Sequence, residues 1–273
     1  MLDRDSPLGS PELHSHIRRE MLAHGIDNLL PVIGFARIVF EHQLVRFGRE
    51  ASSRMKLAVL SDFDGTVTLN DTFENVLARF GKGDWRTVDD QYVRGEITLE
   101  ECVQRQGAMV QVPKSQILSY LDGVTGFRPN FDKLIKFCTT NHFPLVIVSA
   151  GLDFVIKHFL SLEKYQDKVE LVAASAKCAP TGITFDWPKL KSNRSINLKD
   201  DMVRDYKQKA DTVAYIGDGR WDLHALRNAD RRFVIRNSKL AELCKDQDIQ
   251  ATMVIDFQEM VISLQKEMSE RDS

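Results

Sequence analysis

The sequence has little cysteine and no apolar run long enough to span a membrane. Its four cysteines are far apart and form no C-x-x-C pair, which argues against a disulfide framework or a zinc ribbon and fits a reducing compartment. The apolar segment 29–40 contains Arg37 and is shorter than the roughly 20 residues that a transmembrane helix needs. We therefore expect a cytoplasmic protein without a membrane partner.

The sequence also lacks a strong excess of charge of either sign. Its 37 basic and 39 acidic residues give a net charge of -2, so the composition predicts no attraction to nucleic acid or to a membrane surface. A chain of 273 residues can bury a full hydrophobic core in one or two domains. We expect a small-molecule partner, and nothing in the sequence specifies an oligomeric state.

Residues 1–54 precede the first candidate core strand, and Met55 stands just before that strand. The segment has no basic start close to its apolar run and no small-residue cleavage site, so we do not expect a secretory signal. We interpret residues 1–54 as an N-terminal extension, helical or poorly ordered, or as the product of an upstream start codon. A partner-binding helix is the alternative.

Short apolar runs alternate with helical patterns through most of the remaining chain. We expect strands at residues 57–61, 144–149, 171–174, 213–216 and 232–235. Apolar residues recur at helical spacing between most of these runs. This alternation is typical of an α/β fold with a doubly wound, Rossmann-like parallel sheet.

Two segments depart from the alternation. Residues 71–141 are helix-like throughout, so we expect a helical cap inserted into a core of residues 55–70 and 142–267. A cap placed there would overhang the end of the first strand and could act as a lid. Thr181-Gly182, between the β-prone pieces 170–174 and 183–187, predicts a hairpin or flap beside the site.

The first candidate strand ends in two carboxylates. Asp62 and Asp64 belong to the run Asp-Phe-Asp-Gly-Thr at the end of Leu57–Ser61, and ligands of open α/β sheets bind at such strand ends. Two carboxylates this close repel each other unless a cation or a proton lies between them. Asp62 can attack phosphorus, and Asp64 can then act as general acid and base. Taken alone, the run is equally typical of a solvated turn or an N-cap.

The second candidate segment is Ser149-Ala150-Gly151, which ends another apolar run. The serine hydroxyl and the N–H groups of Ala150 or Gly151 can hydrogen-bond a phosphoryl oxygen. Serine is also among the commonest helix N-caps, and a helix is expected to start near Leu152. The segment therefore gains functional meaning only in combination with the others.

The last two candidate segments carry a lysine and two acids. Lys199 stands where a helix begins and can offset the charge of a phosphoryl group, although most lysines are surface residues. Asp218 and Asp222 follow another strand and are placed to meet Mg²⁺, which takes oxygen ligands and keeps several waters. Two acids at a helix start, favoured by the helix dipole, are the plain alternative. All four segments in this order by accident would be rare.

With these segments in this order, residues 56–266 resemble the haloacid dehalogenase-like phosphatase superfamily. The resemblance implies Mg²⁺-dependent hydrolysis of a phosphomonoester, with Asp62 as the nucleophile and Asp64 as the acid and base. It also implies that the helical insert is the type 1 cap of that superfamily. We expect the phosphate group to be bound by Ser149, Ala150, Gly151, Lys199 and Thr66. The resemblance implies that Mg²⁺ is held by Asp62, the Asp64 carbonyl and Asp218, with Asp222 in support.

Several residues bear on the substrate. Asp71-Thr72 and the run 149–153 resemble the branch that includes methionine-salvage phosphatases acting on a methylthio-ketopentenyl phosphate. Phosphoserine phosphatases, which are close relatives, typically carry a glutamate at the position of Asp71 and a cap arginine at that of Gln106. The two differences count against phosphoserine. Trp221 replaces the small residues common before the last aspartate, and either packs or narrows the site.

Four alternatives stay open. A phosphoserine phosphatase, a phosphotransferase or a phosphomutase would use the same four segments, and only the last two pass the phosphoryl group to an alcohol. An inactive regulatory or binding module would have lost a catalytic residue, and none of the motif residues is missing. The substrate expected in each enzymatic case is a small phosphorylated metabolite, with Mg²⁺ as the cofactor.

Overall fold

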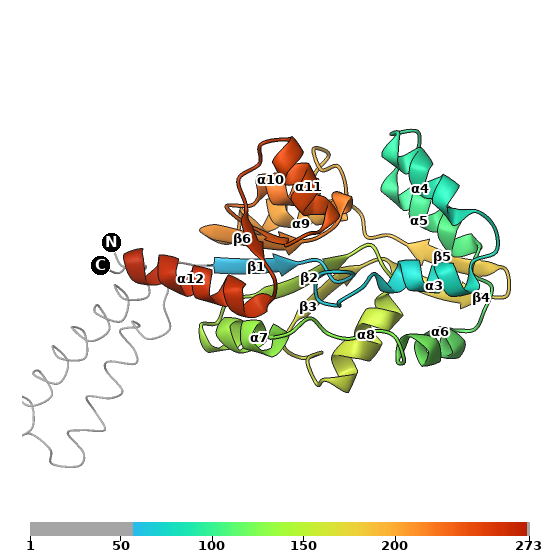
Figure 1. Cartoon of the computed structure of the whole chain (residues 1–273), viewed down its shortest axis with the longest axis horizontal. Helices are drawn as coiled ribbons and strands as arrows, with labels where there is room; N and C mark the ends of the chain where they lie inside the picture. Colours follow the sequence, from blue (N-terminus) through green and yellow to red (C-terminus); the bar gives the residue numbers. More distant parts are fainter. Residues whose placement is uncertain (1–56, 272–273) are drawn as a thin grey trace, which may run out of the picture. The chain divides into compact units, whose positions relative to one another are not determined.

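The computed structural model describes residues 57–271, which form a parallel sheet with helices packed around it (Figure 1). The strands of this sheet are β1 (Leu57–Ser61), β2 (Leu145–Ser149), β3 (Glu170–Ala173), β6 (Thr212–Gly217), β7 (Arg231–Ile235) and β8 (Thr252–Val254). Their order is β3-β2-β1-β6-β7-β8, and every neighbouring pair is parallel. The predicted α/β fold is thus confirmed, while the predicted extension 1–54 lies outside the described residues.

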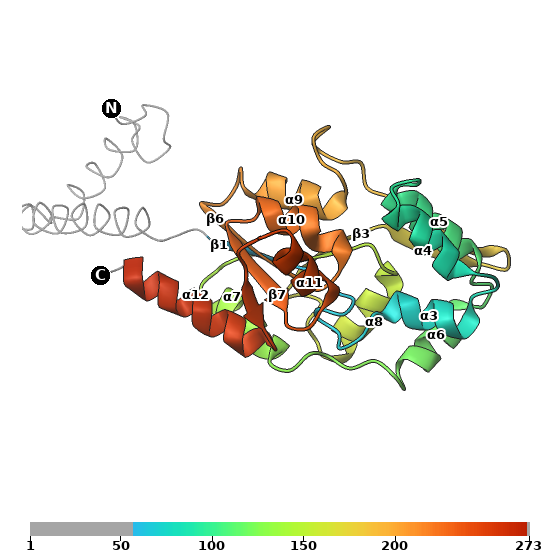
Figure 2. The same cartoon turned by 45° about the horizontal axis from the view of Figure 1, so that its top comes forward.

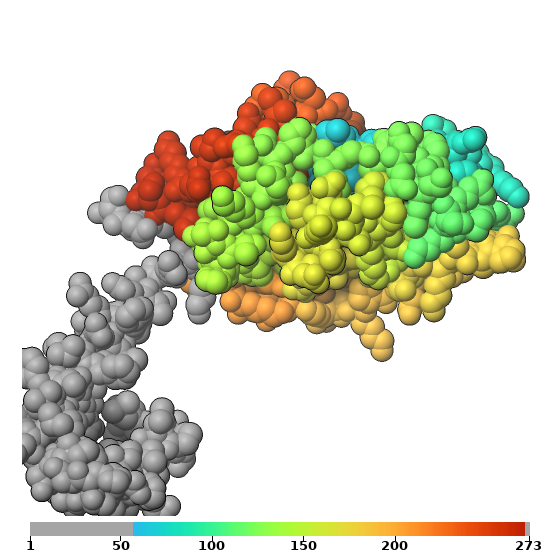
Figure 3. Space-filling view, turned by 90° about the horizontal axis from the view of Figure 1, so that it is seen from below, coloured from blue at the N-terminus to red at the C-terminus, as the bar shows by residue number. Residues whose placement is uncertain are grey.

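Helices cover both faces of the sheet. In Figure 1, α9 (Leu198–Tyr206), α10 (Leu223–Asn228) and α11 (Lys239–Asp246) lie above it, and α7 (Phe131–Thr140), α8 (Asp153–Leu162) and α12 (Phe257–Arg271) lie below. Figure 3 shows α12 in red, α7 in green and α8 in yellow side by side on the lower face. Because both faces are covered, β1, β2 and β6 are buried along their whole length.

Side chains alternate between the two cores along each central strand. Val59 and Ile147 pack below the sheet with α7, α8 and α12, whereas Leu60 and Val146 pack above it with α9 and α10. This alternation follows from the two-residue period of a strand. The short strand β8 was not predicted, because three residues give too little alternation to stand out.

Four helices follow β1 and lie beyond the carboxyl ends of the strands (Figures 1 and 2). They are α3 (Thr72–Phe80), α4 (Trp85–Val93), α5 (Leu99–Ala108) and α6 (Lys114–Leu121). The hairpin of β4 (Ser175–Ala179) and β5 (Gly182–Asp186) packs against α5, and the Phe185 N–H donates to Gln104 Oε1 at 3.1 Å. Two insertions that are distant in sequence therefore lie together over one edge of the sheet.

We propose that α3–α6 form the cap, within the predicted insert 71–141, and that α7 belongs to the core. The reason is packing: the Phe131 ring of α7 lies 5.0 Å from that of Phe257 in α12, below the sheet.

The predicted hairpin exists, but its arms differ from those expected. Segment 183–187 overlaps β5, whereas segment 170–174 pairs with β2 as β3, and the second arm is β4.

Two chain segments that join the cap to the core run side by side. Thr68 and Phe127 form an antiparallel bridge, and the N–H of Arg128 donates to the carbonyl oxygen of Val67 at 2.7 Å. The Arg128 guanidinium also donates to the carbonyl oxygens of Gly65 at 2.6 Å and Thr66 at 2.8 Å. The loop after β1 is therefore anchored where the chain enters and leaves the cap.

Within residues 57–271, none of the helices has the length and apolar character that crossing a membrane requires. The longest of them, α12, has 15 residues and carries Glu259, Lys266 and Glu267. Its inner side packs below the sheet, where Met260 and Leu264 are buried in the core. The amphipathic pattern of α12 is thus explained by packing against this chain's own sheet.

Candidate active site

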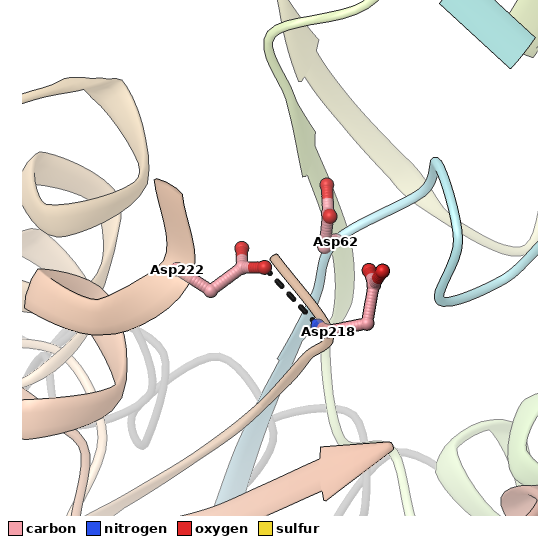
Figure 4. Close-up of side chains that lie close together, drawn as sticks. All are labelled: Asp62, Asp218 and Asp222. Atoms are coloured by element: carbon pink, nitrogen blue, oxygen red, sulfur yellow. Dashed lines mark hydrogen bonds between the residues drawn. The ribbon is translucent and has the colours of Figure 1, made fainter. Parts of the chain in front are cut away.

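Three carboxylates converge at the carboxyl edge of the sheet (Figure 4). Asp62 follows β1, Asp218 follows β6, and Asp222 ends the 3-10 turn η2 (Arg220–Asp222); one oxygen from each lies within 4.8 Å of the others. The strands β1 and β6 are parallel neighbours, so their ends meet. They also flank the point where the chain order of the sheet reverses, which is where open α/β sheets bind ligands.

A lysine bridges two of these carboxylates. Lys199 Nζ lies 2.7 Å from Asp62 Oδ1 and 2.7 Å from Asp222 Oδ1, and its side chain is almost fully buried. The lysine is placed by the start of α9, where the N-cap Asn197 accepts a hydrogen bond from the Asp200 N–H at 2.9 Å. The predicted lysine therefore lies at the site, in contact with the predicted nucleophile.

The cluster carries more negative than positive charge. Burial and the charge of Asp222 raise the pKa of Asp62 well above its usual value, although Lys199 opposes them. Burial and Asp222 also raise the pKa of Asp218 to about 6. Burial lowers the pKa of Lys199, but Asp222 and Asp62 outweigh it and raise that pKa above its usual value. One ammonium thus faces three carboxylates, a charge surplus that a divalent cation would balance.

Asp222 is held entirely by protein donors. Its Oδ1 accepts from Lys199 Nζ at 2.7 Å and from the Tyr215 hydroxyl at 2.7 Å. Its Oδ2 accepts from the backbone N–H groups of Asp218 at 3.1 Å and Gly219 at 2.8 Å. Because both of its oxygens accept these hydrogen bonds, Asp222 fixes the loop that carries Asp218. Asp62 and Asp218 are therefore better placed than Asp222 to bind a cation directly.

Thr66 was predicted to bind phosphate, but the structure does not bring it to the cavity. Its hydroxyl donates to Asp218 Oδ1 at 2.7 Å, and its side chain is fully buried. Gly65 lies beside it with a φ of 74°, and a Cβ there would be 2.3 Å from Asp218 Oδ2. The Gly-Thr pair after the two carboxylates therefore positions Asp218, from the neighbouring strand.

Asp64 is oriented by α3 and by the end of β2. Its Oδ1 accepts from the Thr72 N–H at 3.0 Å and from the Thr72 hydroxyl, and Ser149 Oγ donates to its Oδ2 at 3.4 Å. Burial raises the pKa of Asp64, while the hydrogen bonds from Thr72 oppose that effect. A carboxyl with a raised pKa that faces the same cavity as Asp62 is suited to giving and taking a proton.

Ser149 is not the helix N-cap that a sequence reading also allowed. The N-cap of α8 is Leu152, without a side-chain hydrogen bond, and Ser149 Oγ instead accepts from the Gly151 N–H at 2.9 Å. A Cβ at Gly151 would lie 2.2 Å from Asp64 Oδ2, so a glycine is required for this close approach. Ser149, Ala150 and Gly151 all line the cavity.

A cavity of about 310 Å³ lies between the sheet edge and the cap helices. Its polar floor comes from the core, with Asp62, Asp64, Ser149, Lys199 and Asp218. Its cap side combines the apolar residues Phe73, Leu77, Trp85, Leu99 and Val103 with the polar residues Asp71, Glu74, Asp89 and Gln106. A small cavity with a polar floor and a partly apolar cap side is typical of a binding site for a small molecule.

The sequence reasoning missed two supporting residues. Thr72, in the first turn of α3, holds Asp64, and Tyr215, in the middle of β6, holds Asp222. The signal for Tyr215 was a hydroxyl in a strand that otherwise reads as buried, because a buried tyrosine hydroxyl usually needs a hydrogen-bond partner. Thr72 gave no such signal, since a threonine after an N-cap aspartate is ordinary in a helix start.

We expect Tyr215→Phe to lower the free energy of unfolding by about 1–3 kcal/mol, because a buried carboxylate loses a donor. Asp222 keeps its other three donors, so the fold should survive. Urea denaturation of both proteins measures the difference. Tyr165→Phe is the matched control, since the Tyr165 hydroxyl makes no hydrogen bond within residues 57–271; equal losses in the two variants would contradict the role given to Tyr215.

The fold and the site define an α/β enzyme whose polar groups converge at the carboxyl edge of a parallel sheet beneath a helical cover. Residues 59–227, more than half of the chain, match the family model described as haloacid dehalogenase-like hydrolase. The chain belongs to this family, as its four motif segments predicted.

The chain is also similar to named phosphatases. A 2-hydroxy-3-keto-5-methylthiopentenyl-1-phosphate phosphatase from Bacillus pumilus is 28% identical over 199 residues, which cover 70% of this chain and 83% of that protein. The protein of the same name from Geobacillus thermodenitrificans is 24% identical over 218 residues, covering 78% and 97%. These relatives match the branch that the sequence resemblance indicated.

Solved structures with the same fold include phosphoserine phosphatases. One, described as a phospho-aspartyl intermediate analogue, has a TM-score of 0.59 at 17% identity and covers 77% of this chain and 99% of its own. A substrate-bound complex has a TM-score of 0.58 at 13% identity and covers 77% and 98%. At such low identity, the likeness supports the fold and leaves the substrate to be argued from the site.

Proposed function

We propose that this chain is a Mg²⁺-dependent phosphatase that acts in the cytoplasm on the phosphomonoester of a small metabolite. Its family and its relatives make it a phosphoric monoester hydrolase. The observation that carries the mechanism is the convergence of Asp62, Lys199 and Asp218 on the floor of one cavity. A carboxylate nucleophile, a fixed positive charge and a metal ligand are what phosphoryl transfer to an aspartate requires.

The reaction has two steps. First, a carboxylate oxygen of Asp62 bonds to phosphorus while the bond from phosphorus to the ester oxygen breaks, and Asp64 gives its proton to that leaving oxygen. Second, water attacks the phosphorus, Asp64 takes the proton of the water, and the bond to Asp62 breaks. Thr72 fixes Asp64 Oδ1 and so leaves Oδ2, on the side of Ser149, to carry the proton. Inorganic phosphate leaves and both carboxyl groups are restored.

Lys199 and the hydrogen-bond donors of the cavity floor stabilise the negative charge of the phosphoryl group. Lys199 donates to Asp62 Oδ1 and orients the nucleophile, so that the other oxygen is free to attack. Ser149 and the backbone of Ala150 line the cavity beside it. When Asp64 Oδ2 carries its proton, the Ser149 hydroxyl no longer donates to it and can donate to a phosphoryl oxygen instead. Bound Mg²⁺ would supply further stabilisation of the charge that develops in the transition state. Asp62 and Asp218 would hold the ion, and Asp222 and Thr66 would keep Asp218 in place.

We expect Mg²⁺ to raise the melting temperature of the protein, because an ion that binds only the folded state stabilises it. Asp218→Asn should remove most of this rise, since the variant loses a carboxylate ligand. Differential scanning calorimetry with and without a chelator measures the shift. The control is Asp230→Asn, a surface carboxylate away from the cavity that pairs with Lys207. A full Mg²⁺-dependent rise in Asp218→Asn would contradict the proposed site.

The cap side of the cavity favours a substrate whose tail carries no carboxylate. All basic side chains that line it, Lys199, Arg220 and Lys239, come from the core. The cap contributes apolar residues and acids, and Gln106 in α5 donates from Nε2 to the Trp85 carbonyl oxygen at 3.2 Å. A carboxylate on the tail would therefore find no basic partner on the cap side. This supports a methylthio-ketopentenyl phosphate, the ester of methionine salvage, over phosphoserine.

The direct experiment is a phosphate-release screen of the purified protein with Mg²⁺. The panel includes 2-hydroxy-3-keto-5-methylthiopentenyl-1-phosphate, phosphoserine and other small phosphomonoesters, with and without an added alcohol. We expect the methylthiopentenyl ester to be the best substrate and water the acceptor. Transfer to the alcohol would instead identify a phosphotransferase. Absence of phosphate release from the whole panel, with Mg²⁺ bound, would contradict the proposal.

A further inference from the structure

A stacked pair of aromatic rings joins the cap to the loop of the metal-site acids. Trp221, between Asp218 and Asp222 in η2, stacks on Tyr92 of α4 with ring centroids 3.8 Å apart and planes inclined by 24°. Trp221 also lines the cavity. Its side chain thus has two environments, the Tyr92 ring of the cap and the space in which a substrate would lie.

The backbone of Trp221 is fixed from the core side. Its carbonyl oxygen accepts from Asn197 Nδ2 at 3.2 Å, and Asn197 is itself buried at the N-cap of α9. The next residue, Asp222, has both carboxylate oxygens in hydrogen bonds. The backbone of the turn is therefore held by hydrogen bonds on both sides of the indole, and the stack with Tyr92 is the aromatic contact that orients the ring.

The side of α4 that meets this turn also belongs to the cavity. Trp85 and Asp89 line it, and with Tyr92 they occupy positions i, i+4 and i+7, which share one side of a helix. Arg220, the neighbour of Trp221, lines the cavity too and carries the charge opposite to that of Asp89. The contact between η2 and α4 thus combines the stacked rings of Trp221 and Tyr92 with the opposite charges of Arg220 and Asp89.

We propose that Trp221 determines which phosphate esters fit, and that Tyr92 is the positioning residue that holds its ring against the cavity. The inference deepens the proposed function and rests on it, since it concerns the group attached to the phosphate. The cavity, at about 310 Å³, lies at the small end of the range for ligand pockets, and Trp221 forms part of its wall on the side of η2. We therefore expect the indole ring to leave room for a slim chain beyond the phosphate and to exclude a fused aromatic ring.

The test compares n-propyl phosphate, a slim ester, with 1-naphthyl phosphate, a bulky one, by their kcat/KM values. We expect Trp221→Ala to raise the ratio of the kcat/KM for the naphthyl ester to that for the propyl ester by about tenfold or more. A size difference of a few carbon atoms between two substrates changes kcat/KM by a factor of this order. Tyr92→Ala should shift the ratio in the same direction but less. The double variant should match Trp221→Ala alone, because Tyr92 acts through Trp221.

Two conservative variants and one control variant separate this role from general packing. Trp221→Phe and Tyr92→Phe keep a stack and should leave the ratio close to that of the wild type. Tyr120→Ala removes an aromatic contact with Phe80 inside the cap, where the ring centroids lie 5.4 Å apart, and should leave the ratio unchanged. An unchanged ratio in Trp221→Ala, additive effects of the two alanine variants, or the same shift in Tyr120→Ala would overturn the proposal.

Binding to the Asp62→Asn protein gives a readout without turnover. Calorimetric titration with both esters, with and without Trp221→Ala, should show the same shift in the ratio of dissociation constants. If neither these esters nor any member of the phosphate-release panel is hydrolysed but this shift is present, the proposed function fails and the role of Trp221 stands. If neither ester binds any variant, or the binding ratio does not change, the role of Trp221 is overturned.

Discussion

Asp62→Asn is expected to lower phosphate release by about 10⁴-fold or more, because an amide cannot replace the attacking carboxylate. The loss should appear in kcat, since the variant keeps the cavity and the shape of the side chain. The fold should not weaken in metal-free buffer. Burial and Asp222 raise the pKa of Asp62, so the charged carboxylate is unfavourable there, and a neutral amide relieves that cost. Initial rates and urea denaturation measure the two effects.

The matched control for this variant is Asp167→Asn, an exposed aspartate in the loop before β3. It loses the same charge outside the cavity and should keep wild-type activity. Substantial phosphate release by Asp62→Asn, with Asp64 and Lys199 unchanged, would mean that another group attacks the phosphorus.

Lys199→Met is expected to lower the free energy of unfolding by about 3 kcal/mol or more, because Asp62 and Asp222 lose the buried ammonium that lies 2.7 Å from each. Phosphate release should fall strongly as well, since the phosphoryl group loses a fixed positive charge. Chemical denaturation and rate measurements on the same preparations check both. Lys209→Met is the control, because this exposed lysine pairs with Asp205, and Asp205 keeps its second ion pair with Lys191 in the variant. The free energy of unfolding should fall by less than about 1 kcal/mol.

The stability deficit of Lys199→Met should depend on pH. Without the ammonium, the pKa of Asp62 in the folded state rises further above its unfolded value. The folded variant then binds more protons than the unfolded chain, so its free energy of unfolding falls as pH rises and recovers as pH falls. The difference from the wild type should be largest near pH 8 and smaller near pH 5. A deficit that grows toward acid pH would contradict the account of this cluster.

The sequence predicted those parts of the fold and site that depend on neighbours along the chain. Leu57–Ser61 is a continuous apolar run with acids at its end, so both the strand and the position of Asp62 could be read from it. Asp218 followed in the same way from β6. Lys199 could be selected only through the order of the motifs, and the structure brings it into contact with Asp62.

Contacts between distant segments could not be predicted in the same way. Nothing in the local sequence of Tyr215 indicates that its hydroxyl reaches Asp222, because that contact depends on how η2 folds back over β6. Thr66 has the same limitation, since its partner Asp218 is 152 residues away. The stack of Trp221 on Tyr92 likewise requires the position of the cap over the core.

The most direct test of the central claim is to trap the phosphoryl group on the enzyme. The wild-type protein is mixed with Mg²⁺ and its best phosphomonoester, quenched in acid during turnover, digested and analysed by mass spectrometry. We predict one phosphoryl group on the peptide that contains Asp62, and none on that peptide from Asp62→Asn. Steady phosphate release with no phosphoryl group on Asp62, or with the group on another residue, would contradict the account.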